Sequence, residues 1–296
     1  MAEDSNSNTE GPKKQHWLPC AYLKFFAIDG KINGRNTRVY FTDGEKSIEA
    51  PVKDLAVDKY TYSAANPALD YSFNDMERDY PPIIDQILKG ELPKKKGEYF
   101  GLIMTMCDFN LRNVAYENRT DLERFPLYEG ISRRFNKDMF AEVDGQGADM
   151  KKMLDHLEKN WVLSALFTET EEKFITSDHP SIVFTEPDGK RPVLIYLPVH
   201  PTAAAVAFDK RSVAIINDKI TDSALAILNG LQVKHSVEQV FSDHCLMEKQ
   251  KDWVALQSIT EKEKPDRWIS ETHWCTGFIS ISSPFIKHLT FMRMIG

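Results

Sequence analysis

The sequence has few cysteines and no long apolar run. Its four cysteines are far apart in 296 residues and form no Cys-x-x-Cys pair, so neither a zinc ribbon nor a disulfide scaffold is expected. No apolar stretch approaches the roughly 18 residues that a membrane-spanning helix needs, and the polar, acidic start lacks the features of a signal peptide. We therefore expect a cytoplasmic protein with reduced thiols and no membrane partner.

Basic charge is also scarce, and the common cofactor motifs are missing. The net charge of −7 at pH 7 disfavours indiscriminate attraction to nucleic-acid phosphates. The sequence contains no Gly-x-x-x-x-Gly-Lys phosphate loop, no Gly-x-Gly-x-x-Gly fingerprint, no His-Glu-x-x-His pair and no Gly-x-Ser-x-Gly elbow. These absences exclude the common nucleotide-cofactor and zincin classes.

What is present predicts one α+β domain over residues 15–296, after a polar tail at 1–14 that we expect to be disordered. Strand-like patterns on both sides of Asp43-Gly44 predict an N-terminal β-hairpin. Apolar residues three to four apart predict central amphipathic helices, most strongly between Glu98 and Asn118. From Trp161 the apolar period shortens to two, and short connections predict a mainly antiparallel C-terminal sheet.

The segment 174–180, Phe-Ile-Thr-Ser-Asp-His-Pro, places polar side chains where an apolar strand must end, because Pro180 cannot continue a full hydrogen-bond ladder. Asp178 is a candidate general base or metal ligand, His179 a candidate acid, base or ligand, and Ser177 a candidate substrate contact. Adjacent side chains of a strand point to opposite faces, so Asp178 and His179 should not share one centre. The competing interpretation is an Asx-type turn, in which Ser177 and Asp178 bind nearby amides.

Three further positions are candidates outside this segment. His16 lies where order is expected to begin, and it is either a catalytic group or a polar residue that fixes the first strand. Glu77 lies one position off the apolar stripe of its helix, so it either enters a cleft or is solvated and paired with a neighbour. Arg112 follows Asp108 by one helical turn, and it is either that residue's partner or an anion clamp.

Three segments match known family patterns in order and spacing. Residues 15–26 are similar to His-x-x-Pro-x-x-Tyr-Leu-x-x-Phe, 174–180 to Phe-x-Thr-Ser-Asp-x-Pro, and 196–201 to a proline-marked strand. Together they resemble the domain of unknown function 4238 family. The resemblance implies that His16, Asp178 and His179 act as a set, but it supplies no reaction. Where that family often has glutamine, this chain has Asp108, a carboxylate that could neutralise Arg112.

The first hypothesis is a hydrolase of the nuclease or phosphodiesterase type, acting on nucleic acid or a nucleotide. Its catalytic residues would be His16, Glu77, Asp178 and His179, and its substrate contacts Arg112 and Ser177. Asp178 would activate water or bind a divalent metal, whose identity is open because carboxylates suit magnesium or manganese and imidazoles suit zinc. The second hypothesis is a non-catalytic binding or regulatory module, in which His16 and Asp178 lock two layers together.

Overall fold

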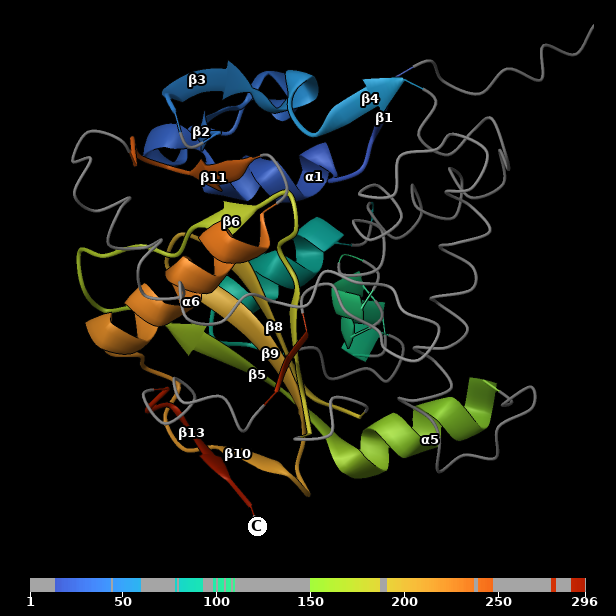
Figure 1. The fold of residues 1–296 in the computed structure, drawn as a ribbon. Coiled ribbons are helices and arrows are strands. Elements are labelled where there is room, and N and C mark those ends of the chain that lie inside the picture. The colour runs from blue at the N-terminus through green and yellow to red at the C-terminus, as the bar shows by residue number, and fades with distance from the viewer. Residues whose placement is uncertain are drawn as a thin grey trace, which may run out of the picture.

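The computed structural model describes part of the chain. The described residues are 14–43, 45–59, 78, 80–92, 98–99, 101–103, 105–107, 109, 150–186, 191–236, 239–246, 278–280 and 289–295. They form helices and largely antiparallel sheets, which confirms the predicted α+β class (Figure 1). Glu77, Asp108 and Arg112 lie outside the described residues, as do residues 1–13. None of the described helices is long and apolar enough to cross a bilayer.

The N-terminal part consists of short elements. They are β1 (Lys14–His16), α1 (Cys20–Leu23), four 3-10 turns (Lys24–Phe26, Ile28–Gly30, Gly34–Asn36 and Val52–Asp54), β2 (Arg38–Thr42), β3 (Ser47–Pro51) and β4 (Val57–Lys59). Strands β2 and β3 form the predicted antiparallel hairpin, with Val39 opposite Ala50. Strands β1 and β4 pair separately and place His16 opposite Val57. Both strand pairs lie at the same end of the molecule (Figure 1).

A four-stranded sheet joins this hairpin to the later part of the chain. Its order is β3-β2-β11-β6, where β6 is Thr176–Ser177 and β11 is Val240–Ser242. Strand β11 is antiparallel to both of its neighbours and places Phe241 between Phe41 and Thr176. The middle of the polar segment 174–180, Thr176–Ser177, is therefore part of the same sheet as the N-terminal hairpin.

The central sheet has five strands in the order β12-β7-β8-β9-β5. Its members are β5 (Trp161–Phe167), β7 (Ile182–Thr185), β8 (Pro192–His200), β9 (Ala203–Asp209) and β12 (Phe278–Ser280). The predicted antiparallel pairing is confirmed for β5, β7, β8 and β9, whereas β12 runs parallel to β7. A parallel neighbour needs a long connection, and β12 follows β7 by more than 90 residues.

Apolar residues cover both faces of the central sheet. Along β8, Ile195 and Leu197 pack with the N-terminal elements and with the helical residues 80–88, while Leu194 and Tyr196 pack with α6 (Asp222–His235). Figure 1 shows α6 lying across strands β8, β9 and β5. Helix α5 (Met150–Asn160) precedes β5, and β10 (Val213–Ile215) pairs with β13 (Met292–Met294) at the end of the molecule opposite β1.

Candidate functional site

The polar segment 174–180 is bound along helix α6. Asn229, on α6, donates from Nδ2 to the backbone oxygen of Lys173 at 2.8 Å. Its Oδ1 atom accepts a hydrogen bond from the backbone N–H of Ile175 at 3.1 Å. One side-chain amide thus satisfies two backbone groups that have left the sheet ladder, which fixes how the segment enters β6.

Gln232 repeats this contact one helical turn later. Its Oε1 atom accepts from the Ser177 hydroxyl at 2.9 Å, and its Nε2 donates to the backbone oxygen of Pro180 at 2.7 Å. The Ser177 oxygen also accepts from the backbone N–H of His179 at 3.2 Å. Ser177 is fully buried. The contacts of Ser177 are those of a turn-forming side chain, the alternative that the sequence had left open.

Asp178 extends the pairing between β6 and β11 beyond the two strands. Its backbone N–H donates to Gln239 O at 2.9 Å, and its Oδ2 atom accepts from Gln239 N–H at 3.0 Å. The exposed fraction of Asp178 is 0%. A carboxylate without exposed surface is stable only when its oxygens are hydrogen-bonded, and Gln239 supplies one of those bonds.

A chain of hydrogen bonds connects Asp178 with Trp17, the neighbour of His16. The side-chain Oε1 of Gln239 accepts from the backbone N–H of Ala56 at 3.4 Å, and Ala56 O accepts from Trp17 N–H at 3.1 Å. Ala56 is buried and has a φ of 46°, which is strained for a residue with a Cβ. Trp17 follows His16 directly. The structure therefore connects the two candidate segments through Gln239 and Ala56.

His16 is the most accessible of the predicted residues that the structure describes. It is half-buried at the end of β1. Its Nε2 atom lies 3.1 Å from the Cys20 sulfur and 3.3 Å from the backbone oxygen of Lys53. The Cys20 thiol in turn donates to Val52 O at 3.4 Å. A half-exposed imidazole with hydrogen-bonding partners can move protons and meet a ligand, which a fully enclosed carboxylate cannot.

Tyr22 connects three parts of the fold at this end. Its hydroxyl oxygen lies 2.6 Å from Pro198 O and 2.6 Å from Thr176 Oγ1. Because a phenol has one proton and Pro198 O can only accept, Tyr22 donates to Pro198, and Thr176 donates to Tyr22. Burial raises the pKa of Tyr22 far above its ordinary value, although the Thr176 hydrogen bond opposes this shift. Tyr22 is therefore neutral at physiological pH.

Reasoning from single residues had missed Tyr22, although it lies in the opening segment that carries the family resemblance. Its ring contacts Phe109, with centroids 5.2 Å apart, and Tyr80, with centroids 5.7 Å apart. Tyr80 and Phe109 are each three residues along the chain from Glu77 and Arg112, respectively. Glu77 and Arg112 themselves lie outside the described residues.

His179 contacts a second buried histidine. It is 1% exposed, and its ring meets that of buried His235 edge to face, with centroids 6.3 Å apart. Within the described part of the chain, no group of three His, Cys, Asp or Glu side chains is placed to hold a metal ion.

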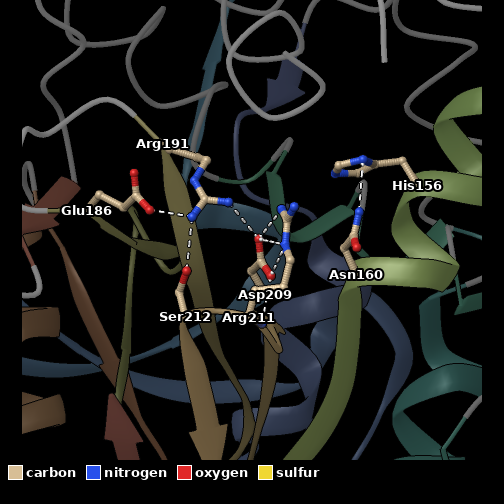
Figure 2. A network of polar contacts seen from close by, with 7 residues as sticks. All are labelled: His156, Asn160, Glu186, Arg191, Asp209, Arg211 and Ser212. Carbon is tan, nitrogen blue, oxygen red and sulfur yellow. Dashed lines mark hydrogen bonds and ion pairs between the residues drawn. The ribbon is translucent and has the colours of Figure 1, made fainter. Parts of the chain in front are cut away.

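Sequence reasoning also missed a network of charged residues, shown in Figure 2, centred on Asp209. The exposed fraction of the Asp209 side chain is 1%, and its Oδ2 atom lies 2.9 Å from Arg191 Nη1 and 2.6 Å from Arg211 Nη2. Arg191 also pairs with Glu186 and donates to Ser212 Oγ at 3.0 Å. The Arg191 and Arg211 side chains are 28% and 37% exposed. One buried carboxylate thus holds two half-exposed guanidinium groups.

This network is separate from the His16 end of the molecule. Asp209 ends β9, and Arg191 lies just before β8, whereas Pro198, which contacts Tyr22, lies near the other end of β8. Six residues of strand correspond to roughly 20 Å. Burial raises the pKa of Asp209, but hydrogen bonds from Arg211 and the charges of both arginines outweigh burial and hold the pKa below its ordinary value. We assign this network to stability.

The fold and site define an α+β protein in which a buried polar segment, held by a helix and a second sheet, is connected with a half-exposed histidine. The chain belongs to the family described as "Protein of unknown function (DUF4238)", whose model matches residues 14–244. This confirms the resemblance seen in the sequence. The matched region begins at β1 and ends just after β11, so it includes every contact from His16 to Gln239. No curated protein and no solved structure matches the chain.

Proposed function

We propose that this protein is a hydrolase of the nuclease or phosphodiesterase type, in which His16 is the acid–base group that meets the substrate. The observation that carries the proposal is the chain of hydrogen bonds from Asp178 through Gln239 and Ala56 to Trp17, next to His16. Functional sites often contain strained backbone, and Ala56 supplies one such residue within this chain.

The burial of Asp178 changes the role that we propose for it. A carboxylate with no exposed surface cannot touch a substrate in this conformation, so Asp178 acts as a positioning residue that keeps β11, β4 and β1 in register. Ser177 has a similar role through Gln232.

Glu77 and Arg112 stay in the proposal as an acid–base partner and an anion clamp. A divalent metal would need ligands beyond the described residues.

The test is hydrolysis of a panel of phosphodiesters by the purified protein. The panel contains single- and double-stranded DNA and RNA, dinucleotides and bis(p-nitrophenyl) phosphate, each with magnesium, manganese, zinc or EDTA. His16→Gln should lower kcat/KM at least about 100-fold, because loss of a general acid or base costs that much. Asp178→Asn should lower it about tenfold by misplacing His16.

His244→Gln is the matched control, since His244 is an exposed histidine that pairs with Asp243 at 2.7 Å. It should leave kcat/KM unchanged. Hydrolysis by His16→Gln at the wild-type rate, or no hydrolysis of any panel member by the wild-type protein, would overturn the proposal.

The second candidate is a non-catalytic binding or regulatory module, favoured by the complete burial of Ser177 and Asp178. Here Asp178 only locks β6 to β11. This candidate predicts that Asp178→Ala chiefly lowers the melting temperature, in a protein with no activity on the panel. The hydrolase candidate predicts that Asp178→Asn lowers kcat/KM by more than its loss of folded protein explains, so measuring both quantities on each variant separates the two functions.

A further inference from the structure

Cys20 and His16 form a thiol–imidazole pair at the end of β1. The Cys20 Sγ and His16 Nε2 atoms are 3.1 Å apart, and both residues are half-buried. Lys53 O lies 3.3 Å from Nε2, and Val52 O lies 3.4 Å from Sγ. A nucleophile and the base that activates it need this hydrogen-bond distance. The pair therefore has the geometry of an activated thiol.

The neighbouring carbonyl oxygens permit two arrangements of the protons. When the thiol is neutral and Nε2 carries hydrogen, the ring donates to Lys53 O and the thiol donates to Val52 O. In the other tautomer hydrogen is on Nδ1, so Nε2 can accept the thiol proton. The ring is then positively charged, and its Nε2–H points at the thiolate. A positive charge beside a cysteine lowers the thiol pKa in general, because it stabilises the thiolate.

We propose that Cys20 is a nucleophilic thiol, activated by His16, and a modification site for small electrophiles such as a peroxide. The opening pattern of the resembled family leaves position 20 unspecified, so the inference concerns this chain and not the family. It rests on the proposed function only in one respect: a modified sulfur would block the imidazole that we assign to catalysis.

The chemistry is a substitution at sulfur. Cys20 transfers its proton to His16 Nε2, and the sulfur attacks one peroxide oxygen. The O–O bond breaks, the leaving hydroxide takes the proton from the imidazolium, and sulfenic acid and water are the products. With iodoacetamide the same thiolate attacks carbon, the C–I bond breaks, and iodide leaves. Both reactions depend on the fraction of thiolate, so iodoacetamide is a suitable probe.

The experiment measures alkylation of each cysteine in the full-length protein by mass spectrometry between pH 5.5 and 9. Cys245 is the internal control, because it is also half-buried, and its neighbour His244 pairs with Asp243 instead. We expect Cys20 to react about tenfold faster than Cys245 at pH 7, because the imidazole at hydrogen-bond distance raises the fraction of Cys20 that is thiolate. Buried Cys107 should stay unmodified.

His16→Gln should slow the alkylation of Cys20 to about the rate of Cys245. Equal rates for Cys20 and Cys245 in the wild-type protein across the pH range would overturn the proposal, even if His16→Gln failed to fold. A folded His16→Gln variant whose Cys20 reacted at the wild-type rate would also overturn it. Fast alkylation in a protein without hydrolytic activity would contradict only the proposed function, whereas slow alkylation in an active hydrolase would contradict only the inference about Cys20.

Discussion

Two buried tyrosines on neighbouring elements have opposite hydrogen-bonding situations. The Tyr22 hydroxyl has two partners, Thr176 and Pro198 O, each at 2.6 Å. The Tyr196 hydroxyl is also buried, but among the described residues it has no hydrogen-bond partner. Burial raises the pKa of both phenols, so both stay neutral in the folded protein. The free energy of unfolding that is lost when each hydroxyl is deleted should therefore depend on its hydrogen bonds and not on its charge.

Tyr22→Phe should lower the free energy of unfolding by about 2 kcal/mol, because Pro198 O and the Thr176 hydroxyl would be left buried without their partner. Tyr196→Phe should change that free energy by less than about 0.5 kcal/mol, because no described group depends on the lost hydroxyl. Urea unfolding of the two variants gives the comparison directly. Equal destabilisation would contradict the stabilising role that we assign to the two hydrogen bonds of Tyr22.

At the scale of single residues, the sequence indicated where the polar segment 174–180 lies. It left the role of that segment open between a catalytic site and a turn. The contacts of Ser177 with His179 N–H and Gln232 favour the turn. The sequence could not decide, because Gln232 is 55 residues away and no local pattern links it to Ser177. The partnership of Gln239 with Asp178 was hidden for the same reason.

At the scale of elements, helix α6 has two roles: it packs on the central sheet and it binds the polar segment. Its apolar residues, including Leu225 and Leu228, pack on the central sheet, while Asn229 and Gln232 bind the backbone of residues 173–180. The helix is fixed at its start by Thr221, whose side chain accepts from Ala224 N–H at 3.3 Å. Helix α6 thus determines both the core and the path of the polar segment.

Gln232→Ala should lower the free energy of unfolding by about 2–3 kcal/mol, since it leaves the Ser177 hydroxyl and Pro180 O without their partner in a buried site. Ser223→Ala, on the exposed first turn of the same helix, is the control and should cost less than about 0.5 kcal/mol. Thermal and urea unfolding measure both variants. A neutral Gln232→Ala would contradict the stabilising role that we assign to the Gln232 hydrogen bonds.

The spacing of apolar residues predicted where strands form more reliably than it predicted which strands pair. The hairpin of β2 and β3 and the antiparallel strands β5, β7, β8 and β9 lie where strand-like patterns predicted them. The pairing of β11 with β2 and of β12 with β7 did not follow, because no local signal specifies a neighbour more than 90 residues away. The pairing of β11 with β2 and β6, together with the hydrogen bond between Gln239 and Ala56, brings the two candidate segments together.

At the scale of the whole molecule, Asp209 couples folding to pH. Its pKa is lower in the folded protein than in the unfolded chain, because two arginines stabilise the carboxylate more than burial destabilises it. A lowered pKa contributes stability that is fully present above the unfolded pKa of about 3.9 and is lost as the pH falls through the folded value.

Asp209→Asn should lower the free energy of unfolding at pH 7 by about 2 kcal/mol, less than for a fully enclosed ion pair because water can solvate both arginines. The difference from wild type should be constant above about pH 5 and should shrink below about pH 4. Glu186→Gln, at a half-exposed position of the network, should cost less than about 1 kcal/mol. Urea unfolding between pH 3 and 7 measures these differences in the free energy of unfolding. If the difference between Asp209→Asn and wild type stayed constant down to pH 3, the Asp209 carboxylate would be excluded as its cause.

The order β3-β2-β11-β6 also has a consequence for the chain while it is being synthesised. The hairpin of β2 and β3 is complete after 51 residues, but β11, which covers the other edge of β2, ends only at residue 242. At about 5–20 residues per second, the ribosome needs roughly 10–40 s to bridge that interval. Throughout that time β2 presents unpaired backbone groups, the kind of edge that other chains can add to. Until β11 is synthesised, this edge of β2 is therefore open to pairing with other chains.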